Sequence, residues 1–269
     1  ISNWVSDIKP DLFFNLGAQS MVHTSFQIPV ETADITGVGV VRVLEAIKKN
    51  SPKTRFLQAS SSECFGGIDT NGSETVQSEK TPFYSRSPYA TAKIMGFYST
   101  VNYRDMGLFA CNAIAFNNES PRRGEVFVTR KITRGLTRCK LGLQNKLVLG
   151  NIFAQRDWSH SSDTSMGMYQ IITADEPDDF VIGMGETHSV KDFLEKVGAK
   201  LDIDYNDYIE ISQKYFRPTE VDILKSDPTK IRTKLNYKPK YTFDMLVNEM
   251  VESDLKLAQQ EKMIKDLQK

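Results

Sequence analysis

Tyr89 and Lys93 have the side-chain types and the spacing of a proton-transfer pair. They follow Ser87-Pro88, a combination that is typical of a helix N-terminus. In a helix, residues four positions apart share a face, so the lysine ammonium can stabilise a tyrosine phenolate. An ordinary tyrosine has a pKa of about 10, and a base that works near neutral pH needs roughly 4 kcal/mol of such stabilisation. A solvated surface pair is the alternative interpretation of this spacing alone.

A hydroxyl group and a carboxylate precede this helix, in the segment Ser-Ser-Ser-Glu at 60–63. Residues 55–60 predict a strand that ends at this segment. The Glu63 carboxylate can take up and return a proton, and the Ser61 hydroxyl can hydrogen-bond a substrate oxygen. Together with Tyr89 and Lys93 they predict a site for acid–base chemistry. A solvent-exposed loop carboxylate is the alternative for Glu63.

The alternation of strands and helices predicts how these residues are positioned. We expect strands at 11–18, 55–60, 109–116 and 180–182, and helices at 32–49, 87–105, 166–174, 189–200 and from 243 onward. The alternation indicates an α/β fold with a mostly parallel sheet. Ligands bind at the carboxyl ends of strands in such sheets, where the polar segments 15–20, 60–63 and 116–119 lie. Beyond residue 253 the chain is rich in Lys, Gln and Glu, and we expect this tail to fray.

The composition excludes several classes of protein. The 34 basic side chains balance the 34 acidic ones, so the net charge gives no sign of a nucleic-acid or anionic membrane partner. The apolar runs are far shorter than the ~20 residues of a membrane-spanning helix. Three cysteines without CxxC spacing suit free thiols in a reducing compartment, so we expect a cytoplasmic protein. The three histidines are too scattered for a metal site.

Local positive charge suits a diphosphate ligand, because arginine forks bind phosphate oxygens with two hydrogen bonds. The candidate groups are Arg122, Arg123, Arg130, Lys131, Arg156 and Arg217. Taken singly, each of these side chains is more typical of a surface ion pair.

A series of motifs in this order resembles the GDP-mannose 4,6-dehydratase family, a branch of the extended short-chain dehydrogenases. The most specific elements are Asn-Asn-Glu-Ser-Pro-Arg-Arg-Gly at 117–124 and Tyr-Phe-Arg-Pro-Thr-Glu-Val at 215–221. Further matches lie at 15–20, 60–63, 86–93, 129–132, 149–151 and 156–158. The resemblance runs from about residue 11 to residue 253.

The resemblance implies a set of site residues. Its catalytic residues are Ser61, Glu63, Tyr89 and Lys93. Its cofactor is NADP, bound by Leu16, Gly17, Ala18, Gln19, Ser20, Tyr89, Lys93, Asn118 and Arg123. Its substrate is GDP-mannose, bound by Asn117, Lys131, Leu149, Asn151, Arg156, Arg217 and Glu220. It also implies a homo-dimer or tetramer.

The implied reaction is an internal redox cycle. Tyr89 takes the proton of the mannose 4-hydroxyl, hydride passes from C4 to NADP+, and Ser61 hydrogen-bonds the same oxygen. Glu63 then removes the C5 proton and returns a proton to the departing C6 hydroxyl. Return of the hydride to C6 gives GDP-4-keto-6-deoxymannose, a step in the synthesis of GDP-fucose.

The family's glycine-rich phosphate loop has no match in the sequence, since no GxxGxxG follows a strand. We therefore expect an N-terminally truncated chain with an incomplete Rossmann-type doubly wound parallel sheet and a smaller interleaved α/β substrate-binding lobe. The expected NADP-binding domain comprises 1–117 and 152–187, and the expected GDP-sugar lobe comprises 118–151 and 188–269. Two alternatives remain: a nucleotide-sugar epimerase or reductase, and a non-catalytic binding or assembly subunit.

Overall fold

The computed structural model describes residues 1–67, 76–216 and 219–268. Its centre is a parallel sheet in the order β1-β2-β4-β9. These strands are β1 (Leu12–Asn15), β2 (Arg55–Ser61), β4 (Ala110–Ala115) and β9 (Asp179–Ile182). The α/β class and the four predicted strands are confirmed, although β1 is shorter than the predicted 11–18.

Helices cover both faces of this sheet because alternate strand residues point to opposite sides. Phe56 and Ala110 pack with α4 (Gly39–Asn50) and α5 (Pro88–Asp105) on one face. Leu57 packs on the other face with α7 (Ser161–Ile172), where Ile231 of α9 (Thr229–Leu235) joins the same cluster. The helix predicted at 32–49 forms as α3 (Pro29–Ala33), the π-helical η1 (Asp34–Val38) and α4.

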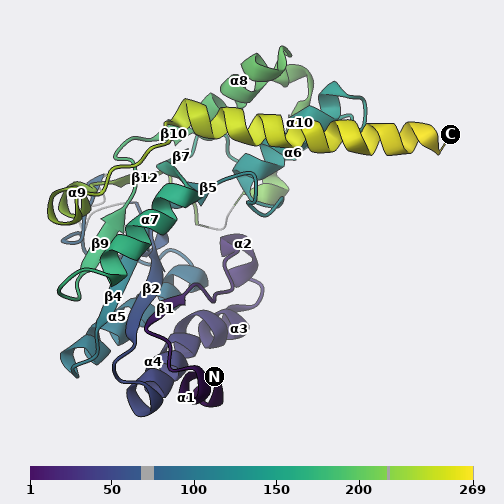
Figure 1. The fold of residues 1–269 in the computed structure, drawn as a ribbon. Coiled ribbons are helices and arrows are strands. Elements are labelled where there is room, and N and C mark those ends of the chain that lie inside the picture. Colours follow the sequence, from purple (N-terminus) through teal and green to yellow (C-terminus); the bar gives the residue numbers. More distant parts are fainter. Residues whose placement is uncertain (68–75, 217–218, 269) are drawn as a thin grey trace.

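Most of the remaining elements form a second lobe, in the upper part of Figure 1, whereas α1 (Ser2–Ile8) and α2 (Val22–Ser25) lie with the main sheet, beside α4 and α5. Its core joins α6 (Val128–Lys140), α8 (Val190–Leu201) and α10 (Phe243–Leu267) around Phe193 and Met250. The small sheets are β6 (Leu147–Leu149) with β11 (Ile209–Ile211), β5 (Asn117–Glu119) with β8 (Trp158–His160), and the order β10-β7-β12-β3. That last sheet comprises β10 (His188–Ser189), β7 (Gln155–Arg156), β12 (Ile223–Ser226) and β3 (Val76–Gln77). The short elements are α1 (Ser2–Ile8), α2 (Val22–Ser25), η2 (Ser62–Phe65), η3 (Tyr205–Asp207) and η4 (Gln213–Tyr215).

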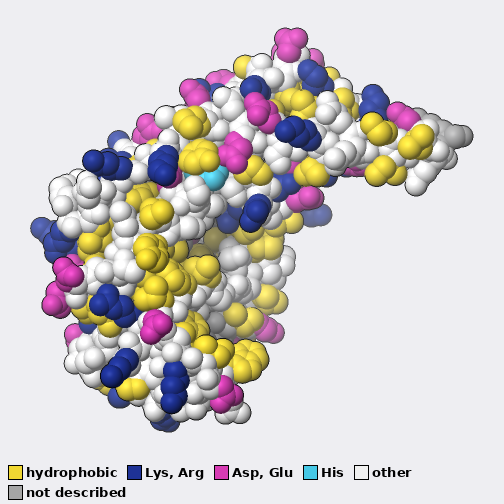
Figure 2. Space-filling model, in the orientation of Figure 1, with side chains coloured by type: hydrophobic (Ala, Val, Ile, Leu, Met, Phe, Trp, Pro, Cys, Tyr) yellow, Lys and Arg dark blue, Asp and Glu magenta, His cyan; other side chains and the backbone are white. Residues whose placement is uncertain are grey.

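The expectation that the tail frays beyond residue 253 is wrong, since α10 is helical to Leu267. Asp254 and Ala258 are fully buried, and Arg130 of α6 donates to both carboxylate oxygens of Asp254 at 2.8 Å. The polar composition of the tail gave no sign of this buried contact, because one of the buried residues, Asp254, is itself charged. The end of α10 projects beyond the rest of the molecule and carries both charged and hydrophobic side chains (Figure 2).

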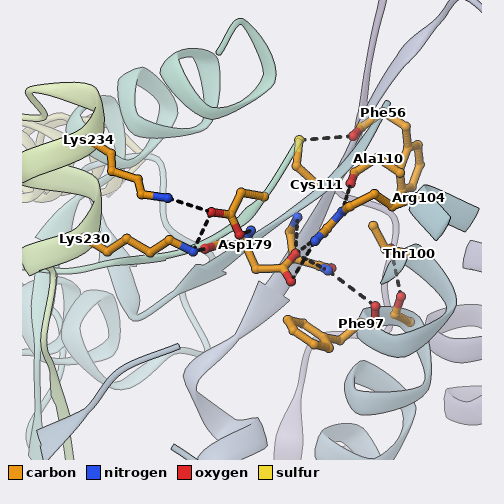
Figure 3. A network of polar contacts seen from close by, with 12 residues as sticks. Phe56, Phe97, Thr100, Arg104, Ala110, Cys111, Asp179, Lys230 and Lys234 are labelled. Atoms are coloured by element: carbon orange, nitrogen blue, oxygen red, sulfur yellow. Dashed lines mark hydrogen bonds and ion pairs between the residues drawn. The ribbon is translucent and has the colours of Figure 1, made fainter. Parts of the chain in front are cut away.

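A polar network ties the C-terminal end of α5 to the amino edge of the sheet (Figure 3). Arg104 of α5 pairs with Asp179 at the start of β9 and donates to the Ala110 carbonyl at 2.7 Å. Asn112 also donates to Asp179, at 2.8 Å. Lys230 of α9 donates to the Asp179 carbonyl at 2.7 Å. The C-terminal end of α5 is thereby fixed at the amino edge of the sheet. This helps to hold the N-terminal residues of α5 at the carboxyl edge.

Candidate active site

Ser61 and Glu63 are placed by the turn that ends β2. Ser61 is the N-cap of η2, and its Oγ accepts a hydrogen bond from the Glu63 N–H at 3.3 Å. Gly66 closes the turn with φ of 66°, and a side chain there would meet the Tyr84 carbonyl oxygen at 2.2 Å. The tight turn keeps Glu63 at the carboxyl edge of the sheet, where 9% of it is exposed.

Tyr89 and Lys93 lie on the buried face of α5, as their spacing predicts. The predicted cap is confirmed: Ser87 Oγ accepts the Ala90 N–H at 3.0 Å, and Pro88 is the first helical residue. The Lys93 Nζ donates to the Ala59 carbonyl at 2.7 Å and lies 5.8 Å from the centre of the Tyr89 ring. The helix thus carries both groups to the end of β2.

The electrostatics of this pair differ from the simplest expectation. Burial raises the pKa of Tyr89, against the opposing effects of a hydrogen bond with Ser61 and the charge of Arg123. The charges of Cys64 and Glu63 raise the pKa of Tyr89 further. Burial lowers the pKa of Lys93 to about 8. The protein without ligand therefore holds a protonated tyrosine, and a bound cationic group is needed to favour its phenolate.

The residues expected to contact the cofactor begin at the end of β1. Leu16 is 62% exposed, and Gly17 and Ala18 follow it toward α2. The Gln19 N–H donates to Thr36 Oγ1 at 2.9 Å, which attaches the segment to η1. Because β1 and β2 pair in register, this segment and Ser61 lie at the same edge of the sheet. Ser20 is exposed in the same segment.

Asn118 and Arg123 belong to the segment after β4. The Asn118 Nδ2 donates to the Phe116 carbonyl at 3.2 Å. Arg123 lies 3.1 Å from Glu119 Oε2, and its guanidinium covers the ring of Phe127 at 3.6 Å. Glu119 is buried and also accepts a hydrogen bond from Thr129 at 2.6 Å. Arg123 is thus held in place while its charge still lowers the pKa of Tyr89.

The residues expected to bind the substrate come from several elements of the chain. Arg156 on β7 is buried, and its Nη2 lies 3.7 Å from Glu220 Oε1. Arg217 lies outside the described residues. Lys131 on α6 lies 4.0 Å from the centre of the Tyr215 ring, and burial lowers its pKa. Asn117 starts β5, Leu149 is buried at the end of β6, and the Asn151 side chain accepts the Phe153 N–H at 2.9 Å.

Of the six basic residues predicted to serve a diphosphate, Arg130 has a different role. It is buried and its guanidinium is used by Asp254 and by the carbonyls of Pro121 and Arg123. Arg122 is exposed. Adjacent residues of a helix point in different directions, so Arg130 faces the core while Lys131 does not.

A cavity of about 340 Å³ lies beside Lys131 and Tyr215. Sequence reasoning missed most of its lining, which includes Arg134, Arg138 and Lys146. The signal was available, because arginines four residues apart in a helix share a face. Arg134 and Arg138 both approach Glu261 of α10, so part of their charge is already balanced.

The described residues contain neither a cluster of metal-ligating side chains nor a helix suited to cross a membrane. Within residues 1–67, 76–216 and 219–268, no group of three or more His, Cys, Asp or Glu side chains could hold a metal ion. In those same ranges, no helix is both long enough and apolar enough to cross a membrane.

Comparison with known proteins identifies the family. A family model described as GDP-mannose 4,6 dehydratase matches residues 1–250. GDP-mannose 4,6 dehydratase 1 of Arabidopsis thaliana is 48% identical over 271 residues, covering 99% of this chain and 74% of the plant protein. The Homo sapiens GDP-mannose 4,6 dehydratase is 44% identical over 275 residues, covering 94% of this chain and 72% of the human protein.

Solved structures agree on the fold. RMD from Pseudomonas aeruginosa, complexed with NADPH, superposes with a TM-score of 0.84 at 21% identity, covering 96% of this chain and 86% of that one. The dTDP-glucose 4,6-dehydratase of Bacillus anthracis, in complex with NAD, gives a TM-score of 0.81 at 20% identity, with 96% and 76% covered. The sheet is thus of the Rossmann type found in nucleotide-sugar epimerases and dehydratases, and this chain belongs to the GDP-mannose 4,6-dehydratase family.

Proposed function

We propose that this chain converts GDP-mannose to GDP-4-keto-6-deoxymannose with loss of water. Membership of the family over residues 1–250 supports this activity. The observation that carries the proposal is the meeting of Ser61, Glu63 and Tyr89 at the end of β2. An epimerase needs the hydroxyl and the phenol, whereas elimination also needs a base at C5 and an acid at the C6 oxygen. We assign both the base at C5 and the acid at the C6 oxygen to the Glu63 carboxylate, which lies at this end of β2.

Each residue of the site has a defined part in the reaction. Tyr89 accepts the proton of the sugar 4-hydroxyl while Ser61 hydrogen-bonds the same oxygen. The 4-keto group makes the C5 proton more acidic, and Glu63 removes it. Glu63 then returns a proton to the C6 oxygen, which leaves as water. Lys93, with its pKa lowered to about 8, still carries a positive charge on most molecules at neutral pH.

The carboxyl edge of the sheet fits the nicotinamide end of a dinucleotide. Tyr89 and Lys93 supply a phenol and an ammonium there, and Gly17 and Ala18 are small enough to allow close approach of a ligand to the backbone. A nicotinamide dinucleotide held there would supply reversible hydride transfer between C4 and C6, so the reaction would be redox-neutral overall. Arg123 is our candidate for contact with a cofactor phosphate. We propose NADP as this cofactor, supported by the NADPH-bound neighbour, although another neighbour holds NAD.

GDP-mannose is proposed to bind between the two lobes through Asn117, Lys131, Leu149, Asn151, Arg156, Arg217 and Glu220. We divide the chain into the NADP-binding ranges 1–117 and 152–187 and the GDP-sugar ranges 118–151 and 188–269. The cluster around the sheet and the cluster around Phe193 support this division. The division has exceptions: Ile231 of α9 packs on the sheet, Leu224 of β12 packs with Phe65 and Ile114, and Trp158 joins the cluster around Phe193. Hydrogen exchange in which both clusters open as one unit would contradict the division.

We also propose that the protein forms a homo-dimer or tetramer. The surface formed by α3, η1 and α5 exposes Val30, Ile35, Met95 and Tyr98 by 75%, 50%, 41% and 53%. Exposed apolar side chains on adjacent helices are typical of a protein–protein interface. A second copy of the chain is the expected partner.

One assay tests the activity. The protein is incubated with GDP-mannose deuterated at C4 and either NADP+ or NAD+, and the product mass and the position of the label are measured. We expect loss of one water with deuterium moved to C6, and a faster reaction with NADP+. A product of unchanged mass with inverted C4 would instead indicate an epimerase. Substrate binding without turnover would indicate a non-catalytic binding subunit.

The Glu63→Gln variant tests the assigned role, because the amide keeps the shape and loses the proton-transfer group. Loss of general acid–base catalysis is expected to slow water loss by about 10²- to 10⁴-fold. Glu252→Gln is the matched control, since Glu252 pairs with Lys200 on the surface, at 3.0 Å. Elimination at the unmodified rate in Glu63→Gln would contradict the proposed role.

A further inference from the structure

Asp157 is a fully buried carboxylate between β7 and β8 that accepts hydrogen bonds from two other segments. Its Oδ1 accepts the Met184 N–H at 2.8 Å, and its Oδ2 accepts the Gly185 N–H at 2.9 Å. The Ser226 hydroxyl at 2.5 Å and the Ser226 N–H at 3.3 Å also donate to Oδ2. The Asp157 N–H in turn donates to the Leu224 carbonyl at 3.1 Å. One side chain thus joins the turn after β9 to the end of β12.

Two glycines line the crowded surroundings of Asp157. A side chain at Gly183 would meet the Ser226 Oγ at 2.3 Å and the Asp157 Oδ2 at 3.0 Å. Gly185 has φ of +83°, a conformation that other residues rarely adopt. The two glycines let the 183–185 turn pass close enough for its N–H groups to reach the carboxylate. Burial raises the pKa of Asp157, and the hydrogen bonds from these four donors oppose that effect by favouring the charged carboxylate.

The residue before Asp157 is Arg156, which belongs to the proposed substrate site. The Arg156 Nη1 donates to the Gln155 carbonyl at 2.8 Å and to the Asp222 carbonyl at 3.3 Å. Its Cα pairs with Leu224 of β12 and with His188 of β10. The position of the Arg156 guanidinium therefore depends on the register of β7 against β12. The Asp157 carboxylate holds that register through Ser226, at the end of β12.

We propose that Asp157 is a positioning residue for binding of the GDP diphosphate. It fixes β12 and the 183–185 turn against β7, so that the Arg156 guanidinium stays aligned with Glu220 at the ligand site. The inference rests on the proposed function, because Arg156 is assigned to the substrate there. Asp157 itself is fully buried, so we assign it an effect on the ligand only through Arg156.

The test is GDP affinity of the Asp157→Asn variant, measured by isothermal titration calorimetry, together with kcat and KM for GDP-mannose. Asparagine replaces one carboxylate oxygen, which accepts hydrogen bonds, with an NH2 group, which only donates. The hydrogen bonds to either the 183–185 turn or Ser226 are therefore lost. We expect the Kd for GDP and the KM to rise about tenfold, with kcat changed less than about threefold.

Asp163→Asn is the matched control. Asp163 is also a buried carboxylate, and its Oδ2 accepts the backbone N–H groups of Lys240 and Tyr241 at 3.0 and 2.9 Å. Both variants are expected to lower thermal stability, but only Asp157→Asn is expected to weaken GDP binding. Equal GDP affinities of the two variants would overturn the inference, because a purely structural role moves stability alone.

A double-variant cycle tests whether Asp157 acts through Arg156. The affinity of Asp157→Asn combined with Arg156→Ala is expected to match that of Arg156→Ala alone. Additive losses would show that Asp157 acts by another route and would overturn the inference.

If Asp157→Asn does not fold, Ser226→Ala removes a single hydrogen-bond donor to Asp157 and is expected to weaken GDP binding about threefold. Unchanged GDP binding by Ser226→Ala would overturn the inference. If the unmodified protein binds no GDP, the proposed function and this inference fail together, whereas unimpaired GDP binding by Asp157→Asn refutes the inference alone.

Discussion

Lys93 should make the stability of this protein rise at alkaline pH. The residue is 4% exposed, and burial lowers the pKa of its amine from 10.5 to about 8. The unfolded chain therefore binds more protons than the folded chain between these two pH values, so the free energy of unfolding increases as pH rises through that window. Below pH 8 both states are protonated and the full cost of burying the charge, roughly 3 kcal/mol, is present.

The perturbation is Lys93→Met, which fills similar volume without a titrating group. Urea unfolding of the unmodified protein and of the variant is compared at pH 7 and pH 10, and the difference between the two proteins isolates Lys93 from the other titrating groups. With the pKa values above, the unmodified protein should gain about 2.5 kcal/mol relative to Lys93→Met between these pH values. The control is Lys49→Met, whose side chain is 71% exposed, and its difference from the unmodified protein should stay flat.

A constant difference between the unmodified protein and Lys93→Met from pH 7 to pH 10 would refute this reasoning. It would mean that the amine keeps an ordinary pKa, with water or a counter-charge beside the Ala59 carbonyl. Burial would then not be destabilising the protonated Lys93 amine near Tyr89.

Two further predictions concern the α10 anchor and the exposed helical surface. Asp254→Asn removes one partner of the buried pair with Arg130 and should cost about 3–5 kcal/mol in urea unfolding, whereas Glu252→Gln on the same helix should cost under about 1 kcal/mol; equal losses would contradict the assigned anchor. Ile35→Lys should dissociate the proposed oligomer in sedimentation velocity, because a charged group would be buried in the apolar interface. An unmodified protein that sediments only as a monomer would contradict that proposal.

The comparison of the sequence with the structure separates local signals from distant ones. The cap at Ser87 and the shared face of Tyr89 and Lys93 follow from short-range rules, and the structure has both. Periodicity also located the four strands of the main sheet. The family resemblance was carried by motifs, and the matching family model covers residues 1–250. These features depend on residues that are close in sequence, so a single chain is enough to infer them.

Tertiary structure decided which charged groups serve a ligand and which serve the fold. Arg130 and Lys131 are adjacent in sequence, yet Arg130 is buried against Asp254, 124 residues away, while Lys131 lines a cavity. Asp157 gains its partners from the 183–185 turn and from Ser226, and none of these contacts has a local pattern. Hydrogen-bond partners at such separations are set by the packing of whole elements. The sequence by itself therefore determined the class of chemistry and the elements that carry it, and only the packed structure determined the partners and the charge state of each group.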